Sequence, residues 1–356
     1  MTASRAPRKA KLSSPAAARQ VPGRFLDAIT QVDCLELLPE LPAESIDCLL
    51  TDPPYGISLD EWDVLHDNTN SALLGQSPAQ IGKSAFRRRG KPINGWRAAD
   101  RQIPREYQAF MDRFARALFP ALKPGASAFL FGARRTVHRA IVAMEDAGFL
   151  LRDVLAWEKP AAHHRAQRLS VVLQRRGLAK EAAAWQGFRL GNLAPRWEPI
   201  AWFFKPYRHT ITDNILLHGL GALAIDCAGA LALGDGKRAT NLLRCGFSAA
   251  HGDGEQRVHE AQKPVRLLEF LLELVTLPGQ VVIDPFAGSG STAVACVRTG
   301  RHFVGCERLP AFVQAAADRI AQARTEVTLA ATPTRAIPAV RRPDRKARTR
   351  VRAQPA

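Results

Sequence analysis

The chain has 356 residues, 46% of them hydrophobic and 23% charged, which is the composition of a folded globular protein and excludes a chain that is disordered throughout. Its formal net charge of +17, from 50 basic and 33 acidic residues, indicates a polyanionic partner, with nucleic acid favoured over an anionic membrane surface. The sequence has no run of about 20 uninterrupted apolar residues, no secretory signal and no CxxC pair among its six cysteines, so we expect a cytoplasmic protein with reduced thiols, no membrane span and no bound metal.

The charge is distributed unevenly along the chain. The two ends, residues 1–22 and 324–356, are strongly basic and have little periodic apolar content, so we expect both to be disordered arms. Residues 71–104 are polar and rich in glycine and arginine, which predicts a mobile basic insert. Residues 23–70 instead carry one basic and eleven acidic residues, which indicates a site for something other than phosphate.

Between the two ends, the apolar periodicity alternates between the patterns of strands and helices. The expected elements, in chain order, are a buried strand at 46–51, a helix at 105–122, a strand at 126–131, a helix at 134–147, a strand at 150–157, a helix at 264–277, a strand at 280–283, a helix ending near 298, a strand at 302–306 and a helix at 310–323. This alternation predicts an α/β protein with a parallel sheet covered by helices. Residues 160–260 show no sustained periodicity.

A glycine-rich loop, from Asp284 to Thr292, lies between an expected strand and an expected helix. With Ala293 it has the spacing G-x-G-x-x-A, in which glycines allow a tight turn and the helix N-terminus offers free N–H groups to a ligand. Glu307 ends the next strand, where a carboxylate can accept hydrogen bonds from ribose hydroxyls. Three ligands fit such a loop: a nucleoside triphosphate, a dinucleotide and S-adenosylmethionine.

The residues of this loop favour S-adenosylmethionine. The loop lacks the lysine with which a P-loop binds phosphates. Asp284 stands at the end of the strand, where its carboxylate would repel the pyrophosphate of a dinucleotide but would suit the amino group of a methionine moiety. A plain tight turn without a ligand is the alternative.

A second motif, Asp52-Pro53-Pro54-Tyr55, follows the expected strand at 46–51. Its two prolines impose a rigid, extended backbone. The Asp52 carboxylate and the Pro53 carbonyl can both accept hydrogen bonds from one NH2 group, and Tyr55 can stack on a planar ring. The motif therefore predicts a receptor for the exocyclic amine of a base, and a proline-rich turn with a buried tyrosine is the alternative. Such hydrogen bonds would free the lone pair of the amine to attack a methyl group without a covalent enzyme intermediate.

The sequence resembles the amino-group DNA methyltransferases, which methylate adenine N6 or cytosine N4 with S-adenosylmethionine. The segments that carry the resemblance are 33–56, 122–132, 157–160, 196–206, 259–292 and 302–308. The DPPY motif precedes the glycine loop, which is the order found in the beta group of this family. The resemblance implies a Rossmann-like fold with a mostly parallel central sheet and a smaller inserted target-recognition region.

The resemblance also implies roles for individual residues. Asp52, Pro53, Pro54 and Tyr55 would hold the target base. The residues implied at the cofactor are Asp284, Phe286, Gly288 and Gly290 around it, Glu307 at its ribose and Asp33 near its adenine, with Lys263 and Thr292 as further cofactor-side positions.

The same resemblance divides the chain between the arms into a catalytic half at 23–206, a target-recognition region at 207–258 and a cofactor-binding half at 259–323. It implies duplex DNA as the partner, with one base flipped out of the stack, and it is compatible with a homodimer. An Asp-first tetrapeptide is usual for adenine and a Ser-first one for cytosine, so adenine N6 is favoured. The alternatives are an N4-cytosine DNA methyltransferase, an RNA base methyltransferase and a nucleic-acid-binding protein that has lost catalysis.

Overall fold

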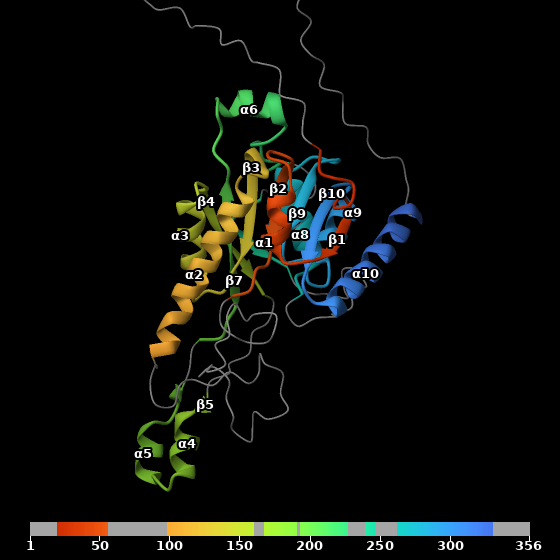
Figure 1. The fold of residues 1–356 in the computed structure, drawn as a ribbon. Helices are drawn as coiled ribbons and strands as arrows, with labels where there is room; N and C mark the ends of the chain where they lie inside the picture. The colour runs from red at the N-terminus through yellow and green to blue at the C-terminus, as the bar shows by residue number, and fades with distance from the viewer. Residues whose placement is uncertain are drawn as a thin grey trace, which may run out of the picture.

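A computed structural model describes residues 20–55, 98–159, 167–190, 193–226, 239–245 and 262–329. At its centre is an eight-stranded sheet in the order β1–β10–β9–β2–β3–β7–β4–β8 (Figure 1). Its strands are β1 (Ala28–Gln31), β2 (Ile46–Thr51), β3 (Leu122–Phe131), β4 (Leu150–Glu158), β7 (Trp197–Phe204), β8 (Leu242–Arg244), β9 (Val281–Asp284) and β10 (His302–Glu307). Every neighbouring pair is parallel except the two pairs made by β7, so the prediction of an α/β protein with a mostly parallel sheet is confirmed.

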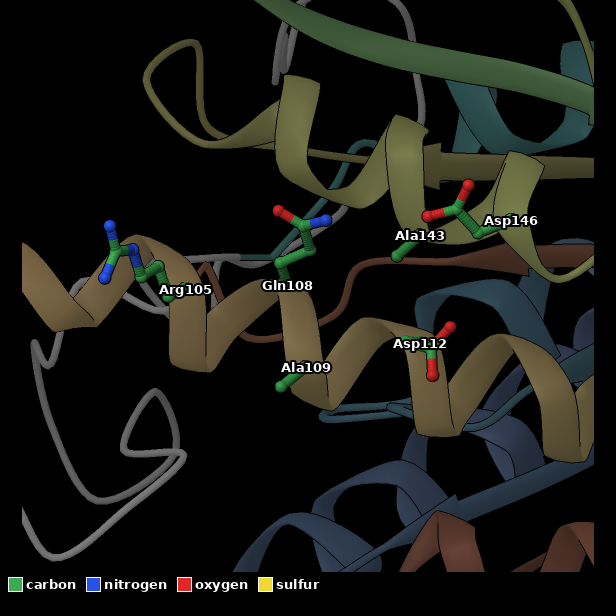
Figure 2. A pocket seen from close by; sticks show the side chains of 6 residues that line it. All are labelled: Arg105, Gln108, Ala109, Asp112, Ala143 and Asp146. Atoms are coloured by element: carbon green, nitrogen blue, oxygen red, sulfur yellow. The ribbon is translucent and has the colours of Figure 1, made fainter.

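Helices cover both faces of the sheet. They are the short α1 (Cys34–Leu37) with the 3-10 turn η1 (Leu38–Glu40), α2 (Ala98–Leu118), α3 (Val137–Asp146), α8 (Val265–Val275), α9 (Ser291–Thr299) and α10 (Pro310–Leu329). The helices α2 and α3 pack on each other, and Figure 2 shows a hollow between them lined by Arg105 and Asp112 of α2 and Asp146 of α3. Within the described residues, no helix is long and apolar enough to cross a membrane.

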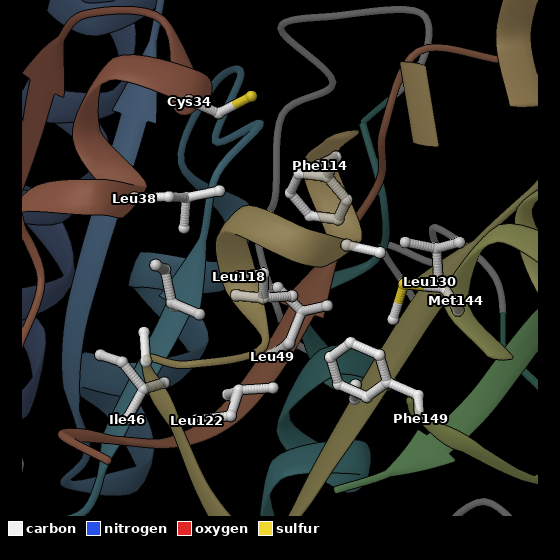
Figure 3. Close-up of a cluster of buried hydrophobic side chains, with 14 of the residues drawn as sticks. Cys34, Leu38, Ile46, Leu49, Phe114, Leu118, Leu122, Leu130, Met144 and Phe149 are labelled. Atoms are coloured by element: carbon white, nitrogen blue, oxygen red, sulfur yellow. The ribbon is translucent and has the colours of Figure 1, made fainter. Parts of the chain in front are cut away.

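Two hydrophobic clusters hold these layers together, one on each face of the sheet. Neighbouring residues of β2 point to opposite faces, as strand geometry requires: Leu49 belongs to the cluster under α2 and α3, and Leu50 belongs to the cluster under α8 and α9. Figure 3 shows the first cluster, in which Phe114 of α2 and Met144 of α3 lie near the strands. All six residues of β2 are buried because helices cover both of its faces.

The expected bounds of two helices differ most from the structure. The helix expected at 105–122 begins earlier, at Ala98, and ends at Leu118. Pro120, two residues later, has no N–H to continue the helix, and Leu122 opens β3 instead. At the other end of the chain, α10 extends beyond residue 323 to Leu329. The remaining residues of the expected arms and of the expected insert at 71–104 lie outside the described ranges, at 1–19, 330–356 and 71–97.

The strand directions place the loops that follow five of the strands at one edge of the sheet. β4 is antiparallel to β7, and β7 is antiparallel to β3, so β4 runs in the same direction as β3 and β2. The carboxyl ends of β2, β3, β4, β9 and β10 therefore share one edge, called here the carboxyl edge. Open α/β sheets bind their ligands at this edge.

The chain between β4 and β7 leaves the sheet at the carboxyl edge and forms a small separate unit. It consists of β5 (Gln167–Arg168), α4 (Leu169–Arg175), α5 (Ala179–Ala184) and β6 (Arg189–Leu190), and these elements pack mainly on one another. In Figure 1, α4 and α5 lie at the bottom of the view, beyond the end of the sheet.

Two elements of the expected recognition region at 207–258 are described. Helix α6 (Ile211–His218) lies at the top of Figure 1, where Asn214 Nδ2 donates a hydrogen bond of 3.1 Å to the carbonyl of Pro124, near the start of β3. It is therefore at the edge opposite the carboxyl edge. Strand β8 pairs with β4 in the central sheet.

Candidate active site

The two sequence motifs meet at the carboxyl edge because β2 and β9 are neighbours. Leu49 lies opposite Ile283 in the parallel pair, so the loops that follow the two strands leave the sheet side by side. Thr51 Oγ1 donates a hydrogen bond of 2.6 Å to Oδ1 of Asp284. The DPPY motif and the glycine loop, separated by more than 200 residues in sequence, thus form one site.

Asp52 and Tyr55 of the DPPY motif are tied together by Lys263. Lys263 Nζ forms an ion pair with Oδ2 of Asp52 and donates a hydrogen bond of 3.1 Å to the hydroxyl oxygen of Tyr55. The Lys263 side chain is only 7% exposed, and its Nζ lies 5.2 Å from the centre of the Phe131 ring at the end of β3. The backbone of the motif is held from another side, where Thr136 Oγ1 donates to the carbonyl oxygen of Tyr55 at 3.1 Å.

The two carboxylate oxygens of Asp52 have different surroundings. Oδ2 is paired with Lys263, whereas Oδ1 is buried and has no hydrogen-bond partner within the described residues. Burial raises the pKa of Asp52, and Lys263 acts against this effect. Asp52 therefore presents one buried acceptor oxygen without a partner among the described residues, on a side chain that is 23% exposed.

The carboxylate of Asp284 is shared between the two strands and the glycine loop. Its Oδ1 accepts hydrogen bonds from Thr51 Oγ1 and, at 3.2 Å, from the backbone N–H of Phe286. Burial raises the pKa of Asp284 to about 6, although hydrogen bonds from Thr292 and Thr51 lower it. Thr292 also links the start of α9 to β2, with Oγ1 3.4 Å from the carbonyl of Leu50.

The two glycines of the loop are needed for different structural reasons. Both have positive φ, +50° at Gly288 and +78° at Gly290, a conformation that other residues adopt at a cost. A Cβ on Gly290 would come within 2.8 Å of the Cβ of Ala316, so this glycine lets α10 approach the loop. A Cβ on Gly288 would meet no atom within 4 Å, so this glycine borders open space.

Glu307 and Asp33 lie at the ends of adjacent strands. Glu307 accepts backbone hydrogen bonds on both of its oxygens, from Gly288 at 3.0 Å and from Leu309 at 2.9 Å. These bonds fix the carboxylate beside the glycine loop. Asp33 follows β1, which pairs with β10, and its Oδ1 accepts from the N–H of Leu35 at 2.8 Å as the N-cap of α1.

The structure thus brings most of the expected site residues to one edge, and it adds contacts that the sequence did not reveal. Phe286 packs its ring on Phe114 and Phe110 of α2, with ring centres 5.3 and 6.0 Å apart. Lys263, expected on the cofactor side, contacts Asp52 and Tyr55 of the DPPY motif. No sequence signal reports this contact beyond the position of the lysine in a Gln-Lys-Pro segment before a helix.

The described part of the chain shows no metal-binding cluster and no exposed thiol near the site. No group of three or more His, Cys, Asp or Glu side chains is arranged there to hold a metal ion. Cys34 and Cys48 are buried, and burial raises the pKa of Cys34 to about 12. These thiols are therefore protonated and poor nucleophiles at neutral pH.

Comparisons with known proteins agree with the chemistry of this site. The family model described as DNA methylase, for N6 and N4 methyltransferases, matches residues 46–318. The Type II methyltransferase M.HindIII of Haemophilus influenzae is 42% identical over 299 residues, covering 83% of this chain and 96% of the relative. The Type II methyltransferase M.HinfI of the same organism is 23% identical, covering 83% of this chain and 68% of the relative.

Two solved structures are also similar. The cytosine-N4-specific PvuII DNA methyltransferase is 19% identical, with a TM-score of 0.49, and the match covers 84% of this chain and 93% of that one. The complex of M1.HpyAVI with SAM is 18% identical, with a TM-score of 0.46, and the match covers 82% of this chain and 98% of that one.

Proposed function

Because the chain belongs to the DNA methylase family, we propose that it transfers a methyl group from S-adenosylmethionine to N6 of an adenine flipped out of duplex DNA. The observation that carries the proposal is the buried Oδ1 of Asp52, which has no hydrogen-bond partner within the described residues. A buried acceptor without a donor is costly, and an N–H of the target amine would satisfy it.

The residues at the glycine loop fit the cofactor. Gly288 borders open space and has its N–H anchored by Glu307, so a ligand can approach the backbone closely there. Asp284 provides a carboxylate for the cationic amino group of the methionine moiety, and Glu307 and Asp33 stand at the strand ends where ribose and adenine would lie. S-adenosylmethionine supplies an electrophilic methyl group on a sulfonium sulfur.

The DPPY residues would position and activate the amine. Asp52 Oδ1 and the Pro53 carbonyl accept its two N–H groups, which weakens the conjugation of the nitrogen lone pair with the ring and directs it away from the base plane. Tyr55, fixed through Lys263 and Thr136, provides an aromatic face for a base that has lost its neighbours in the stack. The raised pKa of Asp52 also makes its carboxylate a stronger base for the proton that the amine releases.

Adenine is the proposed target because the tetrapeptide begins with Asp52 rather than with serine, which is the usual form of the adenine enzymes that the sequence resembles. The carboxylate accepts hydrogen bonds from either an adenine or a cytosine amine, so the geometry of Asp52 alone serves both bases. The identity of the methylated nucleoside decides between them.

The experiment incubates the purified protein with labelled S-adenosylmethionine and, separately, with duplex DNA, single-stranded DNA and RNA, and then digests each product to nucleosides. We expect label in N6-methyl-2′-deoxyadenosine from duplex DNA. Label in N4-methyl-2′-deoxycytidine would overturn the choice of adenine, and label only in RNA would overturn DNA as the substrate. Asp52→Ala serves as the inactive control.

A further inference from the structure

The unit between β4 and β7, residues 167–190, is unusually open for a folded segment. We call it the inserted unit. Of its residues only Ser170 and Ala182 are buried, because its two short helices pack mainly on each other. So small a buried core contributes little stability by itself, and a surface of this kind is typical of a segment that covers a partner.

The exposed side chains of the inserted unit combine positive charge with aromatic and aliphatic surface. It carries one acidic residue, Glu181, and five basic ones: Arg168, Arg175, Arg176, Lys180 and Arg189. Trp185 and Phe188 are 46% and 56% exposed, and their rings meet edge to face with centres 5.0 Å apart. Basic residues among exposed aromatic rings are the combination that nucleic-acid-binding surfaces use.

The position of the inserted unit agrees with this chemistry. It begins after β4 and returns through β7, and the end of β4 lies at the carboxyl edge together with the end of β2. Asp52 follows β2, so the inserted unit extends from the edge that holds the proposed base-binding residue. Figure 1 shows it projecting beyond the sheet there, whereas α6 lies at the opposite edge.

We propose that the inserted unit is a DNA-binding surface that grips the duplex beside the flipped base. This inference rests on the proposed function, because it takes duplex DNA as the substrate. Arg175, Arg176 and Lys180 bind backbone phosphates, and Trp185 with Phe188 contacts sugars and base edges. A second copy of this chain is disfavoured as the occupant, because two such units would bring like charges together.

The test measures binding of a duplex oligonucleotide at several salt concentrations. The variant Arg175→Ala/Arg176→Ala removes two exposed charges from the inserted unit, and Arg113→Ala/Arg324→Ala removes two from α2 and α10 as a matched control. We expect the first variant to bind DNA about tenfold more weakly and to lose about two from the slope of log K against log salt, while the control keeps both values. Trp185→Ala should weaken binding without changing the slope.

Binding of S-adenosylmethionine separates this proposal from the proposed function. All variants should bind the cofactor as the unmodified protein does, because none of the substituted residues lies in the glycine loop. Equal DNA affinity of the inserted-unit variant and the control would overturn the proposal, even if the unmodified protein methylates duplex DNA. A fall from dimer to monomer in Trp185→Ala, measured by light scattering, with unchanged DNA affinity would also overturn it and assign the surface to a second copy.

Discussion

Thr51 at the end of β2 donates its hydroxyl hydrogen to Asp284 at the end of β9, with 2.6 Å between the two oxygens. The bond lowers the pKa of a carboxyl group that burial has raised to about 6. Asp284 is the proposed partner of the cationic amino group of the cofactor, so the ionised form of Asp284 is the form that binds. The hydroxyl of Thr51 therefore helps to set the pH at which the cofactor can bind.

We expect the affinity for S-adenosylmethionine to increase as the pH rises through about 6, because Asp284 then loses its proton. Thr51→Val removes a hydrogen bond that favours the ionised form, so the midpoint should move up by about half to one pH unit. Titration calorimetry between pH 5 and pH 8 measures the midpoint. Thr299→Val, which removes a threonine hydroxyl at the far end of α9, should leave it in place, and an unshifted midpoint in Thr51→Val would contradict the assigned role.

Asp52→Ala should retain cofactor binding and lose methyl transfer by about 100- to 1000-fold, the usual cost of removing one positioned group that acts on the reacting atoms. Asp52→Asn keeps one acceptor oxygen but loses the negative charge. Its rate of methyl transfer should therefore lie between those of the unmodified protein and Asp52→Ala. Single-turnover transfer of labelled methyl groups measures both. Asp112→Asn, which changes a carboxylate of α2 outside the proposed site, is the matched control. Near-normal transfer by Asp52→Ala would remove Asp52 from the mechanism.

Lys263→Met should lower the rate and shift its pH dependence. Lys263 lowers the pKa of Asp52, so without it the pKa of Asp52 rises further and the rate should decline at a higher pH on acidification. The expected displacement is at least about one pH unit. Lys123→Met breaks an ion pair with Asp47 at the opposite edge of the sheet. It should leave the acidic limb of the pH–rate profile unchanged. A rate loss in Lys263→Met with an unmoved acidic limb would indicate a structural role only.

Gly290→Ala and Gly288→Ala should separate stability from cofactor binding. At Gly290 the new methyl group would collide with Ala316 in addition to the cost of positive φ, so we expect the free energy of unfolding to drop by about 2–5 kcal/mol. At Gly288 only the cost of positive φ applies, about 1–2 kcal/mol, but the methyl group projects into the open space proposed for the cofactor. Denaturant unfolding and cofactor titration on both variants test this difference, and equal losses of stability would refute it.

The sequence predicted those elements whose structure depends on residues close together in the chain. The apolar run ended by two prolines predicted β2 as a buried strand, and all six of its residues are buried. The glycine loop and the acid at Glu307 could be placed because a parallel strand, a tight turn and a helix follow one another within a few residues. The meeting of the two motifs followed from the resemblance and from the geometry of parallel sheets.

Long-range partners account for what the sequence did not show. β7 lies between β3 and β4 and is antiparallel to both. The sequence of residues 197–204 does not indicate which strands they pair with. Asp52 and Lys263 are 211 positions apart, so no spacing rule connects them. The expected helix end at Leu122 was wrong. Leu122 continues the apolar spacing of α2 by coincidence, but it is the first residue of β3 and pairs with Ile46 of β2.

The adjacency of β2 and β9 also determines how late in synthesis the proposed site can assemble. The strands β2, β3, β7 and β4 lie within the first 204 residues and can pair as the chain leaves the ribosome, but β9 begins only at Val281. Because domains assemble as their segments become available, the nascent chain exposes the DPPY motif long before Asp284, Glu307 and Lys263 can join it. A chain released before Val281 lacks Asp284 and Glu307, the residues proposed to bind the cofactor, so we expect incomplete translation products to be unable to methylate DNA.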